Sequence, residues 1–201
     1  MDVQAPIPER LTRLAEQVRQ RRDIETRPLN LKNLTSEVRL IAQIYNEAWA
    51  QNWGFLPITD EEAIALANSL RMVADPGMIR FAFFQGKPAG VLGALPDPNY
   101  ALRPRWRWYG DSDLVRVVRL FWMRRRNPVV RLMFFGVSPG FRKLGIDALL
   151  FSEVKEYAMQ RGYKQCEASL LLEDNHLILS PSEFMGAQRY KTWRIYELPL
   201  E

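Results

Sequence analysis

The sequence predicts an α/β protein of the α+β kind, in which a mixed, twisted sheet is flanked by helices. Three observations favour this class. Apolar runs of strand length alternate with stretches in which apolar residues recur every three or four positions. The first half of the chain contains a hairpin signal. In the second half a strand leads directly into a helix and then into another strand, which indicates a parallel crossover.

Composition and length are those of a folded globular chain. Of the 201 residues, 47% are hydrophobic and 25% are charged, close to the averages for such proteins. We expect residues 1–23 to form a helical lead-in and residues 24–201 a single domain with a basic aromatic insertion at about 97–127. No apolar stretch approaches the roughly 20 residues that span a bilayer, and no secretory signal is apparent, so we expect a cytoplasmic protein.

Charge and cysteine usage narrow the chemistry. The formal charge of +5 suits a polyanionic ligand, although it also suits nucleic acid or an anionic membrane. With one cysteine, Cys166, and one histidine, His176, an internal disulfide and a zinc site of the Cys/His kind are excluded. We expect no metal, and we interpret Cys166 as a core residue of a strand.

Periodicity defines the elements of the first half. Apolar residues at helical spacing predict helices over 7–22, 35–51 and 59–71, with an edge strand at 24–30. Thr59 and Glu62 form a capping-box pattern at the start of the third helix. Apolar runs at 78–84 and 89–96 flank the residues Gln-Gly-Lys-Pro at 85–88, which predicts a β-hairpin.

The second half continues with a strand at 129–137 and a helix reaching about Arg161, where Gly162 is a natural stop. A strand at 164–172, an interrupted helix at 173–187 and a final strand at 188–200 follow. Alternating aromatic residues are the basis for the last of these.

The connection between the strand at 129–137 and its helix carries the clearest chemical signal. The strand ends at Val137, and the following turn contains Arg142, Lys143 and Gly145 before the helix begins. Free backbone N–H groups and the helix dipole favour an anion at such a helix start, and the two cations add to this. The glycine removes a side chain where backbone must approach a ligand. The alternative is an ordinary strand-to-helix loop with a solvated Arg-Lys pair.

This segment resembles the phosphate-binding turn of the GNAT N-acetyltransferases, in which Arg/Gln-x-x-Gly-x-Gly/Ala follows a strand ending in Val-x-Pro. Val137, Pro139, Arg142 and Gly145 match that pattern, and the element order from 24 to 198 fits the fold. The resemblance implies a GNAT-like acyl-CoA N-acyltransferase fold with acetyl-CoA or another acyl-CoA as cosubstrate. The implied cofactor-binding residues are Val137, Ser138, Arg142, Lys143, Leu144, Gly145, Ile146 and Asn175.

Within that resemblance Asn175 corresponds to the residue that contacts the pantetheine arm, and Gly186 ends the helix after it. The segments NEAWAQNWGF, LLEDN and RYKTWRIYELPL are also similar to an uncharacterised bacterial GNAT branch. Members of that branch often carry this module as the C-terminal half of a longer chain.

Two positions depart from the family pattern. Asp147 stands where Gly or Ala is usual, and its carboxylate would repel a nearby pyrophosphate unless it points away or caps the helix. Ser182 stands where many members place a Tyr that protonates the departing thiolate, and serine is a poor general acid. Tyr190 is a substitute candidate for this role, although an aromatic at such a position is more often part of a core.

Glu173 is the nearest candidate for a general base, and its neighbour Asp174 is equivalent to it in sequence. The competing and favoured interpretation is that these acids cap the following helix. The resemblance implies direct attack of an amine on the thioester, so that binding and orientation carry much of the catalysis.

The insertion contains a predicted helix at 113–126 that is apolar over most of its surface, with Arg116 and Arg119 on one stripe. Packing on the sheet or a homodimer interface through residues 112–126 is the favoured interpretation. An acyl or acceptor pocket and a membrane surface are alternatives, the latter motivated by Trp106, Trp108, Trp122 and the arginines at 124–126. Nucleic acid ranks last, since no known motif accompanies these arginines.

Two functions follow from the sequence. The first is transfer of an acetyl or other acyl group from CoA to a primary amine on a small molecule or peptide. The second is a GNAT-like module that has lost its chemistry and serves in binding, as an oligomer or on a membrane. Neither the acceptor nor the acyl chain length is encoded in a recognisable pattern.

Overall fold

The computed structural model describes residues 1–102, 112–123, 126–169, 171–173, 175–194 and 196. Its centre is a five-stranded sheet with the order β1-β2-β3-β4-β5. The strands are β1 (Ile24–Pro28), β2 (Ile79–Phe84), β3 (Lys87–Pro96), β4 (Val129–Val137) and β5 (Gln165–Ala168). The pairs from β1 to β4 are antiparallel, whereas β4 and β5 are parallel. The predicted mixed sheet is confirmed.

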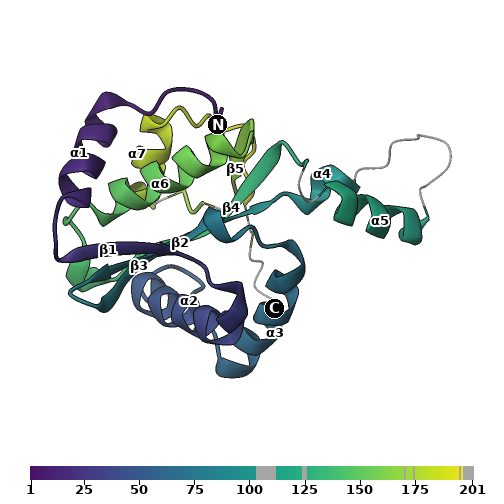
Figure 1. Cartoon of the computed structure of the whole chain (residues 1–201), viewed down its shortest axis with the longest axis horizontal. Coiled ribbons are helices and arrows are strands. Elements are labelled where there is room, and N and C mark those ends of the chain that lie inside the picture. The colour runs from purple at the N-terminus through teal and green to yellow at the C-terminus, as the bar shows by residue number, and fades with distance from the viewer. Residues whose placement is uncertain (103–111, 124–125, 170, 174, 195, 197–201) are drawn as a thin grey trace.

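Helices cover both faces of the sheet (Figure 1). One face carries α1 (Glu9–Arg19), α6 (Ile146–Gln160) and α7 (His176–Phe184), and the other carries α2 (Leu34–Trp49) and α3 (Asp60–Val73). Shorter elements are α4 (Pro98–Leu102), α5 (Asp113–Met123) and the 3-10 turns η1 (Leu31–Asn33), η2 (Pro76–Met78) and η3 (Pro139–Phe141). Neighbouring strand residues point to opposite faces. Thus Phe81 is buried in the α2 and α3 core, and Ala82 in the core beneath α6.

Local signals explain the boundaries that were predicted correctly. The Thr59 side chain accepts a hydrogen bond from the Glu62 N–H at 3.3 Å, and Glu62 accepts one from the Thr59 N–H at 2.9 Å. This capping box starts α3 as expected. Between β2 and β3, Gln85 and Gly86 both adopt positive φ, 49° and 74°. Two left-handed residues form the tight turn that matches strand twist.

The final strand predicted at 188–200 is wrong for the part of the segment that the structure describes. Residues 187–194 and 196 lie in no strand, and residues 195 and 197–200 lie outside the described residues. The alternating aromatic side chains Tyr190, Trp193 and Tyr196 are exposed. Alternation favours a strand only where a neighbouring strand offers a free edge.

The outer edge of β5 is occupied by the first residues of the chain. Asp2 forms an antiparallel bridge with Gln165, and the Cys166 N–H donates to the Met1 carbonyl at 2.9 Å. The Val3 N–H donates to Lys164 in the same ladder. Moreover, β5 ends at Ala168, short of the predicted 164–172, so little edge remains for another strand.

The remaining elements agree with the periodicity in kind. Helix α1 packs against α6 and buries Ala15 and Val18. Helix α5 ends at Met123, three residues before its predicted end, and residues 124–125 lie outside the described part of the chain. Trp106 and Trp108 also lie outside it. Among the described helices, none combines the length and the apolarity that a membrane crossing requires.

Candidate functional site

Strand β4 runs beyond its pairing with β5, and this divergence opens the candidate site. The two strands pair only over Val129–Leu132 of β4. On its other side, β3 shifts register between Gly93 and Ala94, which lie opposite Phe134 and Leu132. Met133 is therefore an extra residue in β4, and such bulges bend a strand and redirect its side chains. Beyond the bulge, one edge of β4 faces open space instead of another strand.

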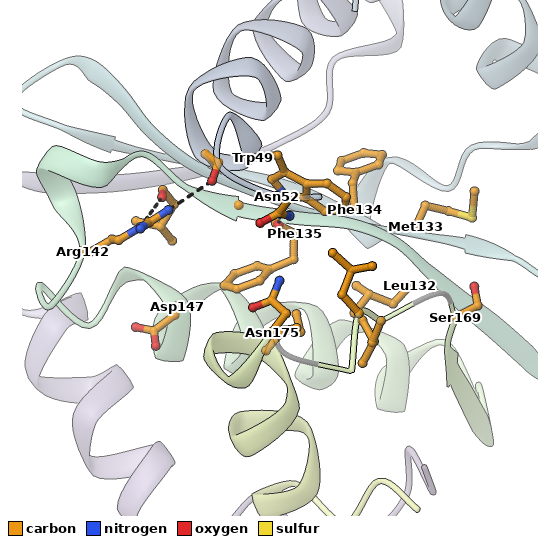
Figure 2. A pocket seen from close by; sticks show the side chains of 16 residues that line it. Trp49, Asn52, Leu132, Met133, Phe134, Phe135, Arg142, Asp147, Ser169 and Asn175 are labelled. Carbon is orange, nitrogen blue, oxygen red and sulfur yellow. Dashed lines mark hydrogen bonds between the residues drawn. The ribbon is translucent and has the colours of Figure 1, made fainter. Parts of the chain in front are cut away.

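The space is a cleft of about 200 Å³ with three walls (Figure 2). The end of β4 forms its floor, the C-terminal end of α2 closes one side, and the segment leading into α7 closes the other. The lining residues are Ala48, Trp49, Asn52, Leu132, Met133, Phe134, Phe135, Gly136, Val137, Arg142, Asp147, Ser169, Leu171, Leu172, Asn175 and Ile178. Most are apolar, so polar groups in the cleft stand out.

Hydrogen bonds show which backbone groups of β4 face the cleft. The Trp49 indole N–H donates to the Phe135 carbonyl at 2.9 Å, and the Arg142 Nε donates to the Val137 carbonyl at 3.4 Å. In an antiparallel pair, alternate residues direct both N–H and C=O away from the partner strand. The N–H groups of Phe135 and Val137 therefore point away from β3 as well. They are donors available to a ligand lying along β4.

Arg142 links the α2 side of the cleft to the end of β4. Besides its bond to Val137, its Nη2 donates to the Ala48 carbonyl at 3.1 Å. That carbonyl lies in the last turn of α2, where carbonyl groups lack helical partners and a cation is favoured by the helix dipole. The guanidinium has five N–H donors, so this arrangement holds the charge in place and leaves donors for an anion.

The turn before α6 presents a row of backbone donors. The Phe141 N–H donates to the Ser138 carbonyl, and the next backbone bond is that of Leu149 to Gly145. Between these, the N–H groups of residues 142–148 meet no acceptor among the described residues. Lys143 adopts φ of 68°, uncommon for a residue with a side chain, and successive N–H groups in such a turn form an anion-binding nest. This geometry suits an anion, and phosphate binding by the turn stays a prediction.

Gly145 was expected to lack a side chain so that a ligand can approach the backbone, but the structure shows a neighbouring helix at this position. Its φ is 78°, and a Cβ built there would lie 2.7 Å from Cγ2 of Val18 and 3.3 Å from Cδ1 of Leu14. Both neighbours belong to α1. The missing side chain therefore makes room for α1 behind the turn.

Two carboxamides point into the cleft from opposite sides, as Figure 2 shows. Asn175, at the start of α7, was predicted to contact the ligand. Asn52, just after α2, was missed. Neither side chain is engaged in a hydrogen bond among the described residues. No sequence signal identifies Asn52, because it lies in an irregular segment that reads only as a helix break.

Other predicted residues support the turn from behind. Ser138 is buried, with its N–H bonded to the Ala89 carbonyl at 2.9 Å. Ile146 is buried and Leu144 is partly buried in the core beneath α6. Val137, Arg142 and Asn175 line the cleft itself, while Lys143 is exposed at its mouth.

Asp147 lies on the cleft wall in the first turn of α6. Its carboxylate forms no hydrogen bond or ion pair with the described residues, and it does not cap the helix, whose N-cap is Gly145. Figure 2 shows it on the same side of the cleft as Arg142, with the carboxylate directed away from the lining of β4.

The predicted catalytic residues lie outside the cleft lining. Glu173 is exposed and pairs with Arg194 at 3.4 Å. The hydroxyl of Tyr190, whose side chain is 65% exposed, donates to Glu167 at 2.7 Å. Asp174, the sequence neighbour of Glu173, lies outside the described residues. The structure does not bring Glu173 and Tyr190 together with the cleft, and their catalytic roles stay predictions.

Two further residues are not part of the cleft lining. Ser182 lies in α7 and is buried. Cys166 contacts the core beneath α6, and burial raises the pKa of its thiol. A raised pKa suppresses the thiolate, which agrees with the interpretation of Cys166 as a core residue.

These features together define a class of protein. A cleft along a strand offers backbone donors and two carboxamides, and it leads to a helix start with free N–H groups and two cations. In shape and chemistry, this arrangement suits an elongated ligand that carries phosphate at one end.

Comparison with known proteins supplies the family. Residues 38–177 match the Acetyltransferase (GNAT) family, and the chain belongs to that family. It is 32% identical over 183 residues to a bacterial ceramide synthase of Caulobacter vibrioides, covering 87% of this chain and 46% of that protein. It is 28% identical over 193 residues to protein YghO of Escherichia coli, covering 93% and 48%. The chain thus spans just under half the length of these relatives.

Solved structures share the fold at low identity. An aminoglycoside acetyltransferase from an uncultured soil sample, in complex with sisomicin, superposes with a TM-score of 0.55 at 12% identity, covering 88% of this chain and 97% of that one. The aminoglycoside acetyltransferase AAC(6')-Ih from Acinetobacter baumannii gives 0.51 at 14% identity, covering 89% and 99%. At such identities the similarity concerns the fold alone.

Proposed function

We propose that this chain is an acyl-CoA-dependent N-acyltransferase domain that transfers an acyl group from the thioester to a primary amine. The observation that carries the proposal is the continuity between the cleft along β4 and the row of free N–H groups at residues 142–148. A CoA thioester has a matching layout, with a pyrophosphate at one end, an amide-bearing arm in the middle and the thioester at the other end.

Each part of the site then has a task. The N–H groups of the turn, with Arg142 and Lys143, bind the pyrophosphate. Asn175 and Asn52 bind the amides of the arm. The backbone N–H of Phe135 or Val137 donates to the thioester carbonyl and to the oxyanion that forms on it.

The chemical step needs little from side chains. The amine nitrogen attacks the thioester carbon, the C–N bond forms and the C–S bond breaks. The thiolate leaves and takes up the proton that the amine nitrogen gives up. Among the described residues that line the cleft, only Arg142 and Asp147 are ionisable. Orientation and oxyanion stabilisation therefore carry most of the rate enhancement, with Glu173 and Tyr190 as secondary candidates for proton transfer.

The acceptor is best sought among long-chain amines. The bacterial ceramide synthase aligns with 87% of this chain, and ceramide formation joins an acyl group to the amine of a long-chain base. The mostly apolar lining of the cleft, which includes Leu132, Met133 and Phe134, suits an aliphatic acyl or acceptor chain. We propose a long-chain amine as acceptor in preference to a peptide.

One observation favours a second function, a binding module without catalysis. Asp147 places an unpaired carboxylate beside the phosphate turn, and Ser182 is buried away from the cleft. If this carboxylate prevents CoA binding, the domain serves in recognition only.

Calorimetry with acetyl-CoA and with free CoA distinguishes the two functions. Asp147→Asn removes the charge at constant size, whereas Asp147→Gly restores the residue usual in the family. For an acyltransferase we expect the parent to bind and both variants to bind about tenfold more tightly, which is about 1.4 kcal/mol. Absence of heat with the parent, together with binding by Asp147→Asn, supports the module without catalysis.

Catalysis itself is tested by mass spectrometry of products. Acetyl-CoA and a long-chain acyl-CoA are each incubated with a sphingoid base and, as a control acceptor, with an aminoglycoside. We expect an amide of the sphingoid base. Acylation of the aminoglycoside alone would contradict the proposed acceptor.

A further inference from the structure

Helix α5 carries the largest group of exposed apolar side chains on any described element. Six residues, which we call the α5 apolar surface, are 47 to 74% exposed: Leu114, Val115, Val117, Val118, Phe121 and Trp122. No residue of α5 is buried, and its principal contact is with the short helix α4. Figure 1 shows both helices projecting away from the sheet and its covering helices. An apolar group of this size on one helix marks an interaction site.

Charged groups on the same helix indicate what it contacts. Arg116 and Arg119 lie one turn apart, and among the described residues the Arg116 guanidinium forms an ion pair with Asp113 at 3.4 Å. Just beyond the helix, the Arg126 guanidinium lies 4.7 Å from the centre of the Trp122 ring. Arginine and tryptophan beside an aliphatic surface are the composition of a helix that lies in a membrane interface. Arginine side chains can extend from the apolar region to headgroup phosphates.

We propose that α5 docks this protein on an anionic phospholipid surface. The α5 apolar surface enters the boundary between headgroups and acyl chains, while Arg116, Arg119 and Arg126 contact lipid phosphates. An 11-residue helix is about 16 Å long, too short to cross a bilayer but long enough to lie in its surface. The formal charge of +5 favours attraction to an anionic membrane.

A second copy of the chain is the main competing occupant. A twofold dimer through α5 would place the same patch of each copy face to face. The positive charges of two α5 helices, from Arg116, Arg119 and Arg126, would then be brought near one another, and like charges disfavour association. A lipid surface supplies negative charge along the whole helix instead.

The position of α5 in the fold suits this role. It precedes the Val129 end of β4, whereas the phosphate turn follows the Val137 end. The first and last of the nine strand residues are eight steps apart, which is about 26 Å. The anionic membrane and the anionic ligand therefore do not compete for one site. This step rests on the proposed function. A lipid amine would then reach the cleft from the α5 side, and CoA would reach it from the side of the turn between β4 and α6.

Vesicle sedimentation tests the proposal. The protein is mixed with vesicles of phosphatidylcholine alone or of equal parts phosphatidylcholine and phosphatidylglycerol. We expect sedimentation with the anionic vesicles, weakened by salt, and little with the neutral ones. Leu114→Glu combined with Phe121→Glu should lower the bound fraction at least tenfold. Leu56→Glu, at a 78% exposed position in the loop after α2, is the matched control and should change nothing.

Equal sedimentation of the parent and the Leu114→Glu/Phe121→Glu variant would overturn the proposal, as would no sedimentation with anionic vesicles. A third result would also overturn it. In this result, the parent is a dimer in analytical ultracentrifugation, the double variant is a monomer, and the parent does not bind vesicles. Circular dichroism confirms that the variants fold. Acetyl-CoA calorimetry on the same variants should match the parent, so loss of vesicle binding and failure of the proposed function remain distinguishable.

Discussion

At the scale of single residues, Asp75 is the most heavily used polar group outside the cleft. It is 9% exposed and accepts hydrogen bonds from the hydroxyls of Tyr157 at 2.7 Å and Tyr163 at 3.2 Å. The Arg161 Nε adds a contact at 3.3 Å. Gly77 permits this arrangement, because a Cβ there would collide with the Tyr157 ring. One carboxylate thus joins the η2 turn to the end of α6.

Replacement of Asp75 by Ala should be strongly destabilising. It leaves two buried or half-buried hydroxyls and a guanidinium without their acceptor, and we expect a loss of about 3 kcal/mol in the free energy of unfolding. Urea denaturation followed by circular dichroism measures it. Asp60→Ala is the matched control, since Asp60 makes a similar bond to Arg39 at 2.7 Å on the exposed surface. Its cost should stay below about 1 kcal/mol, and equal costs would refute the structural role of Asp75.

The same contacts predict a loss of stability in alkali. Burial, followed by the bond to Asp75, raises the pKa of Tyr157 from 10.0 to about 12, and burial also raises the pKa of Tyr163. The folded state therefore favours the neutral phenols. Their stabilising contribution is complete below about pH 10 and decreases as the pH rises through 12. Melting temperatures across this range should fall less steeply for Tyr157→Phe than for the parent, and parallel curves would contradict the prediction.

At the scale of elements, the turn between β4 and α6 must satisfy both a ligand and a neighbouring helix. Gly145 is left-handed and faces α1, whereas Gly140 in the same turn has no atom within 4 Å of a hypothetical Cβ. The two glycines therefore differ in what they tolerate.

Gly145→Ala should destabilise the protein by about 2 kcal/mol, through the positive φ and the contact with Val18. Gly140→Ala, the matched control, should be neutral or slightly stabilising because it restricts the unfolded chain. Thermal unfolding of both variants measures the difference. Similar melting temperatures would show that α1 does not constrain the turn.

Element prediction from sequence succeeded where the determining signals are local. The capping box at Thr59, the hairpin turn and the break between β4 and α6 depend on residues a few positions apart. The final strand was wrong because pairing depends on a free edge, and residues 1–3 hold the edge of β5. Trp49 and Asn52 were missed as site residues for a related reason. Their contact with the cleft depends on how α2 packs against β4, about 85 positions later in the chain.

At the scale of the whole molecule, the sheet separates two cores. One core includes Leu34, Ile41 and Phe81 beside α2 and α3, and the other includes Leu149 and Leu150 of α6. Periodicity identified both sets as apolar, but it could not assign them to opposite faces, because strands such as β2 contribute to each. The basic region before β4 was recognised as unusual, and only the structure shows that α5 lies apart from both cores.

The walls of the cleft belong to different cores: α2 packs with one, whereas α6 and α7 pack with the other. A molecule that fills the cleft would contact elements of both cores. It would therefore link two parts of the molecule that are otherwise connected through the sheet. Binding should then raise the free energy of unfolding by about 2.7 kcal/mol at a ligand concentration 100 times the dissociation constant. The midpoint and the cooperativity of thermal unfolding should rise with it. Differential scanning fluorimetry could therefore rank acyl-CoA chain lengths before any acceptor is known. An unfolding midpoint that CoA thioesters do not change would contradict this link between the two cores.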